Sequence, residues 1–129
     1  MIWGEGRRID ETRELTLLTW GTDCLSRSSP KLCNAQFHVN AKLLNGRGGG
    51  ADLSHNALDE PRVMLNVAQA LAAGRGLVLL RGLVKKIEEG ELKVISVYCS
   101  KGRHRSVSLA VLLSMVYYTS STVRHLTLS

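Results

Sequence analysis

The sequence predicts an α/β domain, a layered sheet flanked by helices, and three observations support this fold class. A Val- and Ile-rich alternating segment at residues 92–99 predicts a strand, and the apolar stretch at 105–118 predicts a buried helix directly after it. The remaining segments order the chain as β, β, α, α, β, α, β, which is typical of layered α/β domains. Because the central strand is apolar on both faces, we expect it inside the sheet, with a ligand at its carboxyl end.

Length and composition favour one domain with anionic partners. The chain has 129 residues, 44% of them hydrophobic, and a net charge of +6, although a solvated basic surface explains this charge equally well. Three cysteines do not make a disulfide framework, and neither a membrane-spanning run nor an apolar signal core is present. We therefore expect a cytoplasmic or nuclear protein without a membrane partner.

The first third of the chain supplies two strands. Residues 1–14 lack periodicity and are predicted to be a flexible N-terminal segment, so that the folded domain spans residues 15–129. Residues 15–20 and 36–41 are predicted strands, joined by a segment rich in turn-forming residues. The cysteines and histidines form no recognisable zinc pattern, so we expect no metal and no cofactor.

The middle third supplies a long loop and two helices. Residues 43–60 are too rich in Gly, Asn and Asp for regular structure, and so long a loop is typical of a functional lid. We expect Arg47 and His55 to contact a ligand, the alternative being an ordinary solvated loop. A helix is predicted from Pro61 to a stop at Gly74, and a second one from beyond Gly76 to Gly90.

Two further expectations concern surfaces and the end of the sheet. The charges Lys85, Lys86, Glu88 and Glu89 on the second predicted helix are typical of a solvated face. Near the end of the chain, residues 121–129 form a β-prone run that is expected to close the sheet.

The loop between the central strand and the buried helix contains the candidate functional residues. Its pattern is Cys99, five residues, Arg105 and Ser106. A short turn that enters a helix collects backbone N–H groups at the positive helix end, and arginine offers a planar fork to two oxygens of an anion. The sequence therefore predicts a phosphate-binding loop, the alternative being a merely basic turn. Its expected phosphate-binding residues are Ser100, Lys101, Gly102, Arg103, His104, Arg105 and Ser106.

The cysteine gives the same loop a second capability. Beside these donors the pKa of Cys99 should be depressed, and the Ser106 hydroxyl could stabilise the thiolate further. The loop could therefore either hold a phosphate or attack one.

The stretch CSKGRHRSVSLAVLL, residues 99–113, resembles the signature of the C-terminal domain of RapZ, a bacterial adaptor protein. The similarity extends more weakly from Leu15 onward, through FHVN at 37–40 and VRHLTL at 123–128. This resemblance implies a domain that senses glucosamine-6-phosphate through the loop, binds small RNAs and self-associates. By position it assigns the ligand loop to Ser100, Lys101, Gly102, His104 and Arg105, and it leaves RNA and a second copy of the chain open as partners.

The loop is also similar to the signature of cysteine-dependent phosphatases. That resemblance implies Cys99 as nucleophile, Arg105 as stabiliser of the transferring phosphoryl group, and Asp52 or Asp59 as general acid. Our first hypothesis remains a regulatory domain that binds a phosphorylated small molecule or free phosphate or sulfate, with the phosphatase as the alternative. A nucleic-acid-binding domain is less favoured, because the basic residues are not interleaved with aromatic ones.

Overall fold

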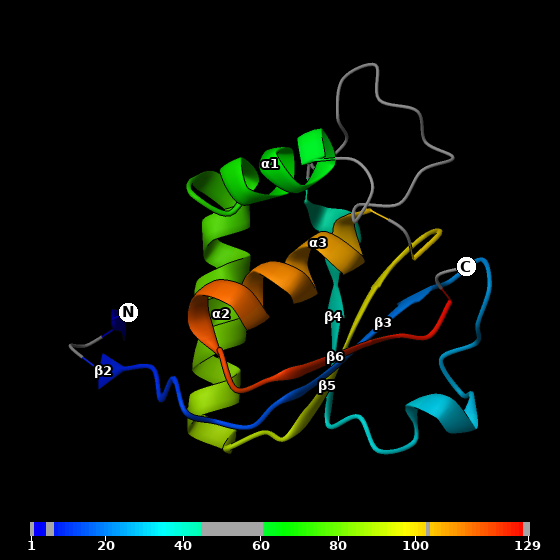
Figure 1. Ribbon diagram of the computed structural model, residues 1–129, viewed down its shortest axis with the longest axis horizontal. Coiled ribbons are helices and arrows are strands. Elements are labelled where there is room, and N and C mark those ends of the chain that lie inside the picture. The colour runs from blue at the N-terminus through cyan, green and yellow to red at the C-terminus, as the bar shows by residue number, and fades with distance from the viewer. Residues whose placement is uncertain (1, 5–6, 45–60, 103, 128–129) are drawn as a thin grey trace.

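The computed structural model describes residues 2–4, 7–44, 61–102 and 104–127, and its architecture is α/β (Figure 1). The strands are β1 (Ile2–Gly4), β2 (Arg7–Arg8), β3 (Thr16–Gly21), β4 (Phe37–Asn40), β5 (Val94–Cys99) and β6 (Thr122–His125). The α-helices are α1 (Pro61–Ala70), α2 (Gly74–Gly90) and α3 (Arg105–Leu112). Two short 3-10 helices, η1 (Pro30–Leu32) and η2 (Ala41–Leu43), and a π-helical segment that continues α3, η3 (Leu113–Tyr117), complete the chain. The predicted fold class is thereby confirmed, and β1 and β2 form an additional small antiparallel pair.

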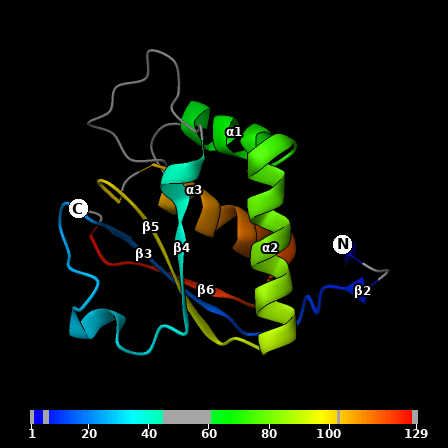
Figure 2. The same ribbon diagram turned by 180° about the vertical axis from the view of Figure 1, so that it is seen from behind.

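The four main strands form a parallel sheet in the order β4-β5-β3-β6. The connections from β4 to β5 and from β5 to β6 cross the sheet in one direction, whereas the connection from β3 to β4 crosses in the opposite direction. Because crossovers between parallel strands are right-handed, the first two place their helices on one face and the third runs over the other. Figures 1 and 2 show α1, α2 and α3 on one side of the sheet and η1 on the other. Within the described residues, no α-helix covers that second face, and the 3-10 helix η1 covers only part of it.

The main core lies between the three helices and the sheet. Its sheet residues share one face because parallel neighbours in register point the same way: Leu15, Leu17, Val39, Ile95 and Val97. A smaller cluster of Leu18, Trp20 and Leu32 lies on the other face, where η1 covers part of the sheet. The strand β5 is therefore buried from both sides, as its apolar pattern predicted.

The boundary between α1 and α2 differs from the prediction. Gly74 does not stop the first helix but begins the second, and Gly76 lies within α2. The two helices meet at an angle of 84°, and a Cβ on Gly76 would lie 1.8 Å from the carbonyl oxygen of Ala70. A glycine is required there because the helices approach so closely. Among the described residues no single helix could span a membrane by length and composition, and these two meet that criterion only as a bent pair.

Glu88 is not part of a solvated face, so that expectation was wrong for this residue. Its Oε1 accepts hydrogen bonds from the Asp10 amide at 3.0 Å and from Arg13 Nη2 at 3.1 Å, and its Oε2 accepts from Arg13 Nε at 3.0 Å and from the Tyr118 hydroxyl at 2.8 Å. The periodicity of α2 could not show this, because the partners come from distant segments. Part of the segment predicted to be flexible is thus bound to α2, and Ile9 is buried in the core.

This network makes stability depend on pH. Burial alone would raise the pKa of Glu88, but the hydrogen bonds from Arg13, Asp10 and Tyr118 outweigh it and lower the pKa. A carboxyl whose pKa is lowered by folding stabilises the fold at a pH above its unfolded value, and that stabilisation is lost as the pH falls through the folded value.

We expect Glu88→Gln to lower the free energy of unfolding at pH 7 by about 1–3 kcal/mol, because hydrogen bonds to a charged acceptor are lost. The difference from the parent chain should shrink as the pH falls below about 4.5, where the unfolded carboxyl is protonated. Urea unfolding between pH 3 and 7 measures this, with Glu14→Gln on the exposed N-terminal segment as control. A Glu88→Gln chain as stable as the parent, or a difference constant down to pH 3, would contradict the assignment.

Candidate functional site

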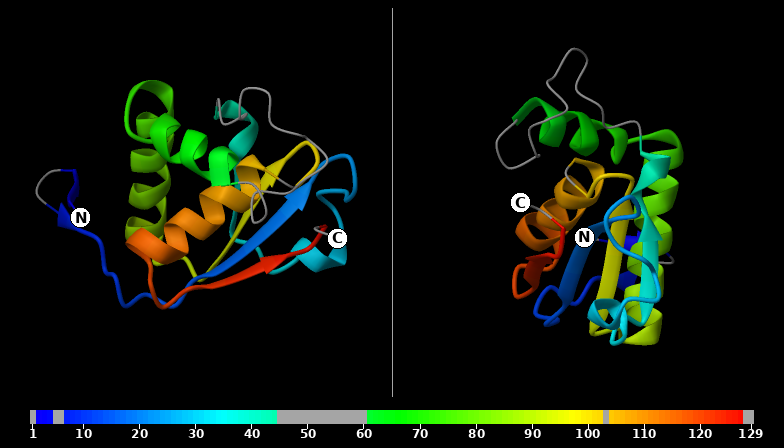
Figure 3. Two further views of the ribbon diagram at one scale, coloured as in Figure 1. Left: turned by 45° about the horizontal axis from the view of Figure 1, so that its top comes forward. Right: turned by 90° about the vertical axis from the view of Figure 1, so that its right-hand side faces the viewer.

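The candidate site begins where β5 ends, between β4 and β3. Cys99 pairs with Gly21, and the pairing continues beyond both strands: the Thr22 amide donates to the Cys99 carbonyl and the Asp23 amide to the Ser100 carbonyl, both at 2.9 Å. The helix α3 begins at Arg105, so strand, short turn and helix follow as predicted. Figure 3 shows the end of β5 turning back into α3 beside the end of β3.

Two glycines let this turn pack against β3 by backbone contact. Gly102 has φ +71°, which a residue with a side chain rarely adopts. A Cβ on Gly102 would lie 2.6 Å from the Gly21 nitrogen and 2.3 Å from Thr127 Oγ1, and a Cβ on Gly21 would lie 2.4 Å from the Lys101 carbonyl carbon. The path of the turn is therefore fixed by the adjoining strand end.

The thiol of Cys99 lies at the start of this turn and interacts with residues that follow it. It is buried and lies 3.2 Å from Ser106 Oγ. Burial raises the pKa of Cys99, but hydrogen bonds from the Ser106 hydroxyl and from the backbone amides of Ser106, Gly102 and His104 outweigh it, so the pKa is lowered. The groups that lower this pKa belong to the turn and to the first residues of α3, and the N-terminus of a helix favours a negative charge.

Arg105 lies at the same edge of the sheet. Its Nη1 donates to the carbonyl oxygen of Lys42 at 2.8 Å, so the half-buried guanidinium connects α3 to η2. The Lys42 ammonium lies 5.9 Å from the centre of the Tyr98 ring. Sequence reasoning did not single out Lys42. Its position just after a parallel strand was the available signal, since such positions share the carboxyl edge of the sheet.

Lys101 and Asp23 form an exposed ion pair on the rim, with 3.4 Å between Nζ and Oδ2. The side chains are 64% and 50% exposed, so the pair contributes little to stability. Asp23 was also missed, although it follows the end of β3. With Lys42, Lys101 and Arg105 against this one carboxylate, the described part of the edge carries an excess of positive charge.

The remaining predicted site residues are placed as follows. Ser100 and His104 lie on the turn and are half-buried. Cys24, which was not a predicted site residue, is exposed beside the turn, with its Sγ 3.9 Å from the Lys101 carbonyl oxygen. Five predicted residues lie outside the described part of the chain: Arg47, Asp52, His55, Asp59 and Arg103. In the described ranges, no three His, Cys, Asp or Glu side chains are grouped as a metal ion would need.

Comparison with known proteins adds no assignment. No family model matches the chain, and no curated protein or solved structure matches it either. The site is therefore interpreted from its own geometry.

The close backbone contact of the turn is tested by Gly102→Ala. This change places a side chain at positive φ and against Gly21 and Thr127, so we expect a loss of at least about 2 kcal/mol in the free energy of unfolding. The matched control is Gly82→Ala in α2, where an added Cβ meets nothing within 4 Å and should stabilise the helix by about 0.5–1 kcal/mol. Equal stability of the two variants would contradict the packing described.

The contact between Ser106 and Cys99 is tested by titrating the thiol. Because the hydroxyl stabilises the thiolate, Ser106→Ala should raise the pKa of Cys99, which thiolate absorbance near 240 nm reports. The experiment uses a Cys24→Ser, Cys33→Ser background, since both thiols are exposed. Ser114→Ala is the control, because that hydroxyl donates to the Val111 carbonyl away from the turn. An unchanged midpoint in Ser106→Ala would show that the hydroxyl does not act on the sulfur.

Proposed function

We propose that this chain is a regulatory domain that binds phosphate or a phosphorylated small molecule through residues 99–106. The observation that carries the proposal is the buried Cys99 thiol at the start of α3, which lies 3.2 Å from Ser106 Oγ and whose pKa is lowered by that hydroxyl and by the amides of Ser106, Gly102 and His104. Amides that stabilise a thiolate can also stabilise the oxygens of an anion seated over it.

The side chains around the turn support a dianion as ligand. Arg105 has five N–H donors, of which one bonds the Lys42 carbonyl, and a guanidinium can present two others to a phosphate in parallel. Lys101 is exposed enough to exchange Asp23 for a ligand oxygen, since an exposed ion pair is weak.

Phosphate binding should depend on the protonation state of the Cys99 thiol. A phosphate dianion over Cys99 competes with a thiolate for the same amides and is repelled by it. Phosphate binding should therefore favour the protonated thiol. A neutral residue at position 99 should leave the anion site intact, which is the behaviour of a binding module.

The ligand class follows from the likeness of the turn to the RapZ C-terminal signature. That likeness favours a phosphosugar over inorganic phosphate, and we propose a phosphorylated sugar as the physiological ligand. RNA and a second copy of the chain remain partners suggested by the same likeness alone.

A cysteine-dependent phosphatase is the second candidate. The lowered pKa of Cys99 favours it, since the thiolate is the attacking species. Such an enzyme also needs a general acid at the leaving group. The two aspartates predicted for that role lie outside the described residues, and Asp23 is paired with Lys101. Binding is our first proposal because it needs only the donors that the described residues supply.

Titration with inorganic phosphate, followed through the backbone amides by NMR, tests the proposal. We expect saturable shifts at Gly102 and Arg105. Arg105→Ala should weaken binding at least about tenfold, because hydrogen bonds to a charged group are worth about 1.5–3 kcal/mol. Arg81→Ala, an exposed change of the same charge on α2, is the control. Unchanged affinity in Arg105→Ala, or no shifts in the turn, would refute the proposal.

The variant Cys99→Ser distinguishes the two candidates. A sensor should bind phosphate with unchanged or higher affinity after this change, and the parent chain should not hydrolyse p-nitrophenyl phosphate. Hydrolysis by the parent chain that disappears in Cys99→Ser would instead establish the phosphatase.

A further inference from the structure

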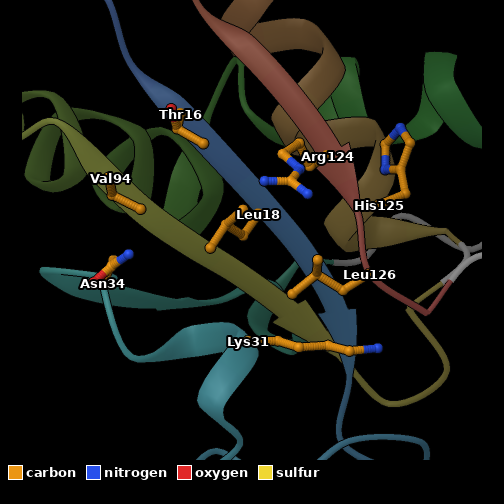
Figure 4. Close-up of a pocket in the computed structure, with 8 residues that line it drawn as sticks. All are labelled: Thr16, Leu18, Lys31, Asn34, Val94, Arg124, His125 and Leu126. Carbon is orange, nitrogen blue, oxygen red and sulfur yellow. The ribbon is translucent and has the colours of Figure 1, made fainter.

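The face of the sheet without α-helices carries a groove of about 540 Å³ (Figure 4). Four segments that are distant in sequence meet there: β3, β5, β6 with the residue after it, and the connection between β3 and β4. The lining residues are Thr16, Leu18, Lys31, Asn34, Val94, Arg124, His125 and Leu126. Small-molecule sites in proteins commonly have volumes of about 300–1,000 Å³, so the groove has the size of a ligand site.

The groove has apolar surface that the connection does not cover. Leu18 is buried, whereas Val94 and Leu126 are only half-buried although they pack against the small cluster of that face. The topology explains this exposure, because a connection of irregular structure covers less of a sheet than a helix does. An apolar group of a ligand would gain burial against these side chains.

The charged side chains of the lining are both cations. Lys31 and Arg124 are exposed, and neither has an ion-pair partner among the described residues. Figure 4 shows Arg124 and Lys31 on opposite sides of Leu18 and Leu126. His125 does not add a third cation at pH 7, because burial lowers its pKa; its Nδ1 lies 2.7 Å from Thr19 Oγ1. Among the described residues, no acidic side chain lines the groove.

We propose that this groove binds a small amphipathic anion, with its apolar body on Val94 and Leu126 and its anionic group at Arg124 or Lys31. The site is separate from the proposed phosphate site, since none of the described residues of 99–106 lines it. A nucleic acid is less suited as occupant. The described lining residues include no aromatic ring on which a base could stack.

Naphthalene-2-sulfonate is a suitable probe because it combines a flat apolar body with one negative charge. Titrated into the full chain, it should produce saturable NMR shifts at the amides of Asn34, Val94 and Arg124. 2-Naphthol lacks the anionic group and inorganic phosphate lacks the apolar body, so each should bind there at least tenfold more weakly. Saturation of the groove should be unaffected by phosphate bound at residues 99–106.

Charge reversal tests which side chains recognise the probe. The double change Lys31→Glu, Arg124→Glu should weaken binding at least tenfold, whereas Arg75→Glu, Lys85→Glu on the exposed face of α2 should leave it unchanged. The single change Lys31→Glu should also weaken binding. Because Lys31 lies outside the sheet, this variant checks that the weaker binding does not come from a folding defect. The proposal is overturned if the groove amides do not shift, if 2-naphthol binds equally well, or if charge reversal has no effect. These results leave the phosphate titration of the turn untouched, so the two proposals fail separately.

Discussion

The candidate site depends on the direct contact between the backbones of Gly21 and Gly102. Each glycine lies where a Cβ would overlap the other segment, and Gly102 also needs a positive φ. This contact holds the turn after β5 against the end of β3, and so sets the direction in which its amides point. The order of the sheet makes the contact possible, because β5 and β3 are parallel neighbours that end together.

Electrostatics follow from that geometry. A buried sulfur would ordinarily hold its proton, yet the amides of Gly102, His104 and Ser106 shift the balance toward the thiolate. The site is thus organised for negative charge before any ligand arrives. Preorganised donors of this kind bind an anion without first breaking their own structure, which is why a short turn of ordinary residues can act as a specific site.

The sequence was sufficient for the fold class and for the position of the turn, because both depend on local pattern. The alternating apolar pattern at residues 92–99 predicted β5, and the apolar residues after the turn predicted the helix that follows it. Contacts between distant segments were not predictable in this way. The ion pair of Glu88 with Arg13, the position of Lys42 beside Arg105 and the pairing of Asp23 with Lys101 each join segments whose proximity only the topology determines. Gly74 was misassigned because a glycine after a helix signals a stop, whereas here the chain turns sharply into another helix.

The most direct test of an anion site at this turn is a crystal structure of the chain soaked with tungstate, a phosphate mimic with strong anomalous scattering. We expect tungsten over the Cys99 sulfur, with its oxygens within about 3 Å of the loop amides and of the Arg105 guanidinium. Amides that point away from the sulfur, or an anomalous map with no peak at residues 99–106, would contradict the account.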